Sequence, residues 1–135
     1  MSEVIDLLKK SGYSDKAIEY YMNKVNVGEI EDHNTHFTYT GPCGDTMAMF
    51  LKIESGVIKD AKFQAIGCAG AFASGSALTE MIKEKTFEEA ERLDERDIVN
   101  HLGAIPEPKI HCACLAKRTL GFAIEDYGQR RAQET

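Results

Sequence analysis

The sequence predicts one α+β domain, in which a small three-stranded antiparallel sheet packs against several helices. The chain has 135 residues, 43% of them hydrophobic, which is enough for one core. Its patterns run in the order helices, three strands, helices, as in folds that segregate an antiparallel sheet from its helices. No repeat, low-complexity stretch or linker divides it. We therefore expect a single domain over residues 1–135, with a core over 20–127 and peripheral ends.

The first forty residues carry helical and then β patterns. Apolar residues at helical spacing predict helices over residues 2–10 and 14–24, and Ser14 is the expected N-cap of the second. Residues 35–40 alternate and are rich in β-formers, so they predict a strand that ends at the pair Gly41-Pro42.

A β-hairpin is predicted next. Apolar residues alternate over 47–53, and Ser55-Gly56 is a typical reversal before a second alternating run over 57–66. These two runs and the strand before them complete the predicted sheet.

The second half is mostly helical. The apolar period changes to that of a helix from residue 70, and Thr86 with Glu89 three positions later predicts a capping box. Residues 93–102 predict a short helix that ends before a proline-containing loop, and residues 113–127 predict the last helix. The polar tail is expected to fray.

Charge and targeting signals exclude several classes of protein. The formal charge of -6 opposes binding to a phosphate backbone or to anionic lipid. The N-terminus mixes acids with apolar residues, unlike a secretory signal, and no apolar run reaches membrane-spanning length. We therefore expect a cytoplasmic protein that binds neither nucleic acid nor membrane, with cysteines that are ligands or nucleophiles rather than disulfides.

Three cysteines fall where the predicted elements break. Cys43 lies between two strands, Cys68 between the last strand and a helix, and Cys112 at the start of the final helix. Loops and helix N-termini present side chains and favour thiolate, so the three together indicate a site. Any one of them alone could equally be a buried apolar residue.

Two other side chains extend this set. Asp45 follows Cys43 by two residues, and His111 precedes Cys112. Together they exceed the four ligands of a tetrahedral Zn²⁺ or a small iron–sulfur cluster, so the residues predict a three-thiolate metal or thiol site completed by Asp or His. On a helix, Cys114 would point about 200° away from Cys112 and is expected to be a packed residue, or to replace Cys112 if the helix begins after it.

The other histidines, His33, His36 and His101, have no partner suggested by spacing, and we interpret them as exposed or hydrogen-bonded side chains.

In combination these residues resemble the scaffold family of IscU and the amino-terminal domain of NifU. The resemblance covers residues 20–127 and rests on Asn26-Val27-Gly28, Gly41-Pro42-Cys43-Gly44-Asp45, Phe63-Gln64-Ala65-Ile66-Gly67-Cys68-Ala69-Gly70-Ala71, Ser76-Ala77-Leu78-Thr79-Glu80-Met81-Ile82-Lys83 and Lys109-Ile110-His111-Cys112 with Leu115-Ala116. It implies that Cys43, Cys68 and Cys112 accept sulfur and iron, that Asp45 takes part in ligation or release, and that His111 is an alternative ligand.

The resemblance also implies a function. An iron–sulfur cluster, expected to be [2Fe–2S], would be assembled from Fe²⁺ and desulfurase-derived sulfur and then transferred, which makes the chain a scaffold rather than a turnover enzyme. Cys112 is the expected sulfur acceptor. The implied partners are a cysteine desulfurase of the IscS/NifS type and apo iron–sulfur proteins, and a homodimer bridged by a cluster is compatible with this role.

Three features of the sequence show which members of the family it resembles most. The family's chaperone-recognition pentapeptide, Leu-Pro-Pro-Val-Lys, corresponds to residues 105–109, Ile-Pro-Glu-Pro-Lys, which weakens the case for dependence on an Hsp70 and its J-protein. His111 argues against the related SufU branch, which lacks that histidine. No region resembling the later domains of NifU follows residue 127, so a stand-alone scaffold is expected.

Two rival functions use the same residues. Three cysteines with Asp or His also form an ordinary Zn²⁺ site of a structural or regulatory protein. A thiol enzyme could use Cys43 or Cys112 with His111 as base, although nothing in the sequence suggests an oxyanion hole or a substrate motif.

Overall fold

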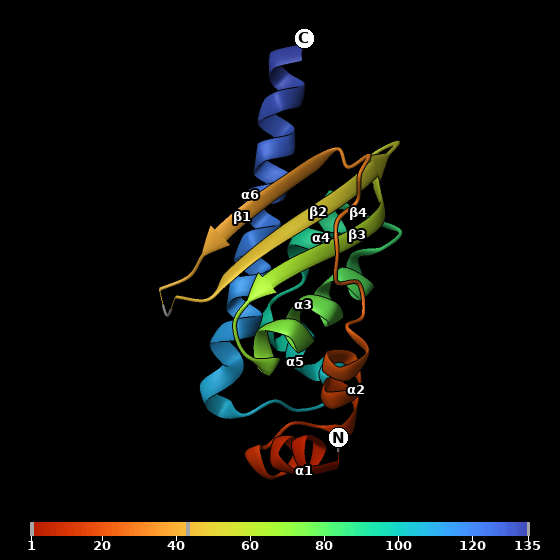
Figure 1. Ribbon diagram of the computed structural model, residues 1–135. Helices are drawn as coiled ribbons and strands as arrows, with labels where there is room; N and C mark the ends of the chain where they lie inside the picture. The colour runs from red at the N-terminus through yellow and green to blue at the C-terminus, as the bar shows by residue number, and fades with distance from the viewer. Residues whose placement is uncertain (1, 43, 135) are drawn as a thin grey trace.

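The computed structural model describes residues 2–42 and 44–134 (Figure 1). The helices are α1 (Ser2–Ser11), α2 (Asp15–Asn23), α3 (Ala69–Ile82), α4 (Phe87–Arg92), α5 (Glu95–Leu102), the 3-10 turn η1 (Glu107–Lys109) and α6 (Ile110–Glu134). The strands are β1 (Thr35–Thr40), β2 (Thr46–Glu54), β3 (Val57–Ile66) and β4 (Lys85–Thr86). Helices α3 and α6 cover one face of the sheet (Figure 1).

The sheet is antiparallel, as predicted, but it has four strands rather than three. Its order is β1-β2-β3-β4. The fourth strand is only two residues long and pairs with the first two residues of β3. Glu84 turns the chain with a φ of 66° and donates its N–H to the carbonyl of Ile58 at 2.7 Å. Two residues are too few to show an alternating pattern, which is why this strand was not predicted.

Residues 26–28 also attach to β3. The Phe63 N–H donates to the Asn26 carbonyl at 3.0 Å, and the Gly28 N–H donates to the Phe63 carbonyl at 2.8 Å. The Asn26 side chain donates to Thr79 Oγ1 at 3.1 Å and accepts a hydrogen bond from Lys83 at 2.8 Å. The segment therefore joins the sheet to α3.

The core lies between the sheet and helices α3 and α6. Its largest fully buried hydrophobic side chains come from the sheet and from helices α3, α5 and α6: Met47, Met49, Leu51, Ile58, Phe63, Leu78, Ile82, Ile98, Leu102 and Leu120. Helix α3 approaches β3 closely at Gly75, where a Cβ would lie only 2.5 Å from the ring of Phe63. Only glycine allows this separation without a shift of the ring or helix.

Several predicted helix boundaries are confirmed by their caps. The Ser14 hydroxyl accepts a hydrogen bond from the Ala17 N–H at the start of α2, and Thr86 and Glu89 form the predicted capping box. Asp94 caps α5, so that helix begins at Glu95 rather than at residue 93.

The last helix is longer than predicted. It begins at residue 110, directly after η1, and continues to residue 134 instead of covering 113–127. The prolines of the preceding loop stand before the helix, where they remove no helical hydrogen bond. None of the described helices has the length and apolarity needed to cross a membrane.

Candidate metal centre

The ends of the central hairpin bring two segments of the site together. The register of β2 and β3 pairs Thr46 with Ile66, so Asp45 and Gly67 are neighbours just beyond the sheet. A Cβ on residue 67 would lie 2.9 Å from both Cγ and Oδ2 of Asp45. The carboxylate therefore occupies space that is available only because residue 67 is glycine.

Two of the predicted thiols meet at the N-terminal ends of α3 and α6. Cys68 is the N-cap of α3, and Cys112 lies in the first turn of α6. Their Sγ atoms are 3.6 Å apart, and Cys112 is buried. Helices α3 and α6 pack closely here, because a Cβ on Gly70 would lie 3.2 Å from Cys112 Sγ.

His111 is held in an orientation that suits metal binding. Its Nδ1 lies 2.7 Å from the carbonyl oxygen of Pro108, which can only accept, so Nδ1 carries the proton. Its Nε2 then has a free lone pair and lies 3.6 Å from Cys112 Sγ. A backbone carbonyl that fixes the tautomer is typical of metal-ligating histidines.

Four predicted ligands therefore converge. The ligand atoms of Asp45, His111 and Cys112 lie within 4.8 Å of one another, and Cys68 adjoins Cys112. Cys43, the fifth predicted ligand, lies outside the described residues. Soft sulfur, borderline imidazole and hard carboxylate donors together suit iron, sulfide or Zn²⁺.

The pKa values of Cys68 and Cys112 are shifted in opposite directions. A hydrogen bond from Cys112, together with the Gly70 and Ala71 N–H groups at the start of α3, lowers the pKa of Cys68 to about 5. The same hydrogen bond, burial and the nearby negative groups raise the pKa of Cys112. Cys68 is therefore the more acidic thiol of the pair, and Cys112 donates the hydrogen bond between them.

Two further side chains, which were not predicted to belong to the site, adjoin the thiols. The Tyr13 hydroxyl and the Lys109 side chain both lie against Gly70, beside Cys112. Burial and the two neighbouring thiols raise the pKa of Tyr13 to about 12, so it remains a neutral phenol. Lys109 lowers the pKa of both cysteines. No motif in the sequence points to Tyr13, whereas Lys109 belongs to the motif that contains His111 and Cys112.

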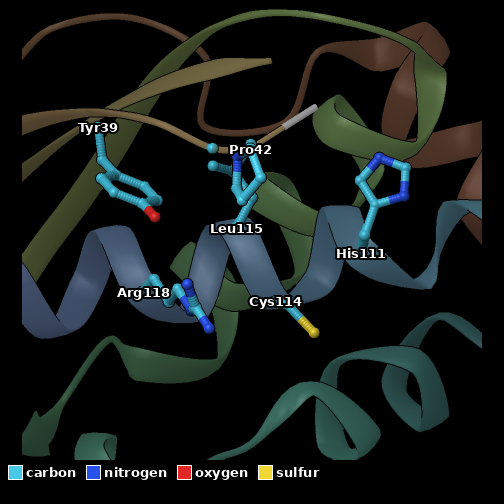
Figure 2. Close-up of a pocket in the computed structure, with 7 residues that line it drawn as sticks. Tyr39, Pro42, His111, Cys114, Leu115 and Arg118 are labelled. Carbon is cyan, nitrogen blue, oxygen red and sulfur yellow. The ribbon is translucent and has the colours of Figure 1, made fainter. Parts of the chain in front are cut away.

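Cys114 lies apart from the thiol pair. Figure 2 shows His111 and Cys114 leaving α6 in different directions. Cys114 lines a cavity of about 450 Å³ together with Tyr39, Gly41, Pro42, His111, Leu115 and Arg118. Burial, followed by the charge of Glu95, raises the pKa of Cys114. This placement agrees with the helical phase that separates it from Cys112.

Residues 12–134 match the family described as the NifU-like N terminal domain. The chain belongs to this family. The match spans the whole sheet and all the residues of the candidate metal centre. It confirms the resemblance drawn from the cysteine-containing motifs.

Relatives of this NifU-like domain carry informative names. The chain is 42% identical over 122 residues to the iron–sulfur cluster assembly scaffold protein IscU 1 of Archaeoglobus fulgidus, covering 90% of this chain and 80% of that protein. It is 41% identical over 124 residues to the scaffold protein IscU of Azotobacter vinelandii, covering 88% and 96%.

Solved structures show the same fold. A scaffold protein of the SUF system, FiSufU from Fervidobacterium islandicum, superposes with a TM-score of 0.69 at 27% identity, over 82% of this chain and 95% of that one. The N-terminal part of a NifU-like protein from Brucella abortus superposes with a TM-score of 0.66 over 86% and 94%, and at 18% identity it supports the fold alone.

Proposed function

We propose that this chain is a scaffold on which a [2Fe–2S] cluster is assembled from Fe²⁺ and desulfurase-derived sulfur and then passed to apo-proteins. The observation that carries the proposal is the convergence of Cys68, Cys112, His111 and Asp45 at one end of the sheet. The names of the relatives support the same role. We further propose that residues 1–135 act as one scaffold unit.

The donors have different roles in this proposal. The thiolates of Cys43, Cys68 and Cys112 hold iron firmly, because sulfur is the soft ligand that iron–sulfur clusters prefer. Asp45 and His111 supply harder or borderline donors that exchange more easily. A shell with one exchangeable position suits temporary storage better than four thiolates.

Sulfur enters at Cys112. The Cys112 S–H first turns from Cys68 Sγ to the free Nε2 of His111, each 3.6 Å away, and gives up its proton there. The resulting thiolate attacks the outer sulfur of the desulfurase persulfide, so that an S–S bond forms on Cys112 and the desulfurase thiolate leaves. Reduction of this sulfur to sulfide takes two electrons from an external reductant. The partners are accordingly a cysteine desulfurase and apo iron–sulfur proteins.

A zinc protein is the second candidate, because two sulfurs, an imidazole and a carboxylate also form a tetrahedral Zn²⁺ site. Anaerobic incubation with cysteine, a desulfurase and Fe²⁺ separates the two. A scaffold develops the visible absorption of a cluster, and equimolar Zn²⁺ only slows this. If bound Zn²⁺ persists and no chromophore forms under reducing conditions, the zinc function is correct.

A further inference from the structure

Two histidines, His33 and His36, lie side by side near the start of β1. The imidazole ring centroids of His33 and His36 are 5.0 Å apart, with an angle of 73° between the planes. Both rings rest on Phe50 of the neighbouring strand: His36 stacks on it and His33 meets it edge-on, each at 5.4 Å. Phe50 is buried, and its ring contacts both imidazoles.

The tautomer of His33 is fixed in the same way as that of His111. Its Nδ1 lies 2.7 Å from the carbonyl oxygen of Ile30, three residues earlier, and the His33 N–H donates to the same oxygen at 3.3 Å. Nδ1 therefore carries the proton, and Nε2 is left with a free lone pair. Backbone carbonyls that accept a hydrogen bond from one ring nitrogen orient metal-binding histidines in this way.

The turn that carries His33 is held on both sides. Lys52 on β2 donates to the Asp32 carbonyl at 3.0 Å and pairs with the Asp32 carboxylate at 3.3 Å. The Asn34 side chain accepts a hydrogen bond from the Ile53 N–H at 2.6 Å. The two imidazoles are thus largely positioned before any ion binds.

We propose that His33 and His36 bind one divalent transition-metal ion of borderline softness, such as Zn²⁺. A tetrahedral Zn²⁺ with Zn–N bonds of about 2.0–2.1 Å places its two nitrogens about 3.3 Å apart, a separation that rings with centroids at 5.0 Å reach by small rotations. Imidazole is a preferred ligand for such ions.

The remaining coordination positions go to water. Among the described residues, one group of three or more His, Cys, Asp or Glu side chains has all its ligand atoms within 4.8 Å of one another. That group is Asp45, His111 and Cys112. The pair therefore has no third protein ligand there, and Asp32 is engaged by Lys52. His36 pairs with Phe50, and about 17 Å of strand lies between Phe50 and Asp45. The two sites can therefore be occupied independently.

The probe is Zn²⁺, added to the full chain under reducing conditions. The first equivalent fills the thiolate site, and the second is followed by imidazole ¹⁵N NMR and by titration calorimetry. We expect the second equivalent to shift the Nε2 resonance of His33 and a ring nitrogen of His36. His33→Gln and His36→Gln should each weaken this second binding step at least tenfold.

His101→Gln is the matched control, because His101 is bound to Tyr20 on the other side of the core. It should leave the second binding step unchanged. The proposal is overturned if the His33 and His36 resonances do not move, or if all three histidine variants bind the second equivalent equally well. The same titration of a Cys68→Ser, Cys112→Ser double variant should retain the histidine step even if the thiolate site no longer binds.

Discussion

The carboxylate of Asp45 lies against Gly67, with Cγ and Oδ2 each only 2.9 Å from the position that a β-carbon of residue 67 would take. This contact follows from the hairpin register that places Asp45 beside Gly67. Because residue 67 has no side chain, the carboxylate of Asp45, the proposed exchangeable ligand, can lie close to the thiols.

Replacing this glycine should move the ligand without unfolding the protein. Gly67→Ala forces the Asp45 side chain to rotate away, and because the displaced group is the end of a side chain, we expect a stability loss within about 1 kcal/mol. Thermal unfolding and cluster transfer should be measured together. A variant that transfers its cluster at the wild-type rate would show that the placement of Asp45 is not required.

Asp45→Ala should separate assembly from release. Without the exchangeable carboxylate, His111 completes the shell, so the reconstituted cluster should persist several times longer and reach an acceptor more slowly. The half-life of the cluster and its transfer rate are compared with those of the wild type. Faster loss of the cluster with undiminished transfer would make Asp45 a bystander.

The thiol ligands should behave differently from the fourth cysteine. Cys43→Ser, Cys68→Ser and Cys112→Ser should each abolish stable cluster formation, whereas Cys114→Ala, whose side chain lines a cavity together with Tyr39 and Arg118, should retain most of it. Visible absorption after anaerobic reconstitution measures this, with circular dichroism as the control for folding. Equal damage from Cys114→Ala and Cys112→Ser would contradict the assignment of the site to one side of α6.

Much of this arrangement could be predicted because the cysteines coincide with breaks in the hydrophobic pattern. The sequence indicated that Cys68 and Cys112 end or begin elements, and periodicity separated Cys114 from them. Asp45 and His111 were candidates because they adjoin cysteines. The distances that join these segments depend on the hairpin register and on helix packing, which local patterns do not contain.

The unpredicted features have physical explanations. β4 is too short for a periodic signal, and the extension of α6 to residue 134 occurs in a polar segment without an apolar stripe. Tyr13 reaches the thiols only because α2 packs against α3, a contact between distant parts of the sequence. Such tertiary contacts cannot be derived from spacing alone.

Packing between α3 and the sheet gives a prediction about stability. Gly75→Ala would place a Cβ 2.5 Å from the Phe63 ring, and overpacking of this kind costs about 1–3 kcal/mol. Gly121→Ala on α6 is the matched control, because its Cβ would meet nothing within 4 Å and should stabilise the helix by about 0.5–1 kcal/mol. Denaturant unfolding measures both. Similar effects from the two substitutions would contradict the close approach.

His101 predicts a pH dependence of stability. Burial and, secondarily, Lys16 hold its pKa below the ordinary value, opposed by Glu80, and its Nε2 lies 3.1 Å from the Tyr20 hydroxyl. The unfolded chain therefore binds the proton more readily, so the free energy of unfolding falls as the pH drops below about 6.5. His101→Gln should make this decline shallower. Parallel stability curves for the two proteins would show that His101 contributes nothing to it.

A scaffold must build a cluster and deliver it intact to another protein. The most direct measurement loads the protein anaerobically with a desulfurase, cysteine and Fe²⁺, removes the reagents, and mixes it with an apo-ferredoxin in the presence of a strong Fe²⁺ chelator. We predict that the ferredoxin acquires its cluster while the chelator captures little iron. If the iron appears on the chelator and the ferredoxin stays empty, the chain is not a scaffold that transfers clusters.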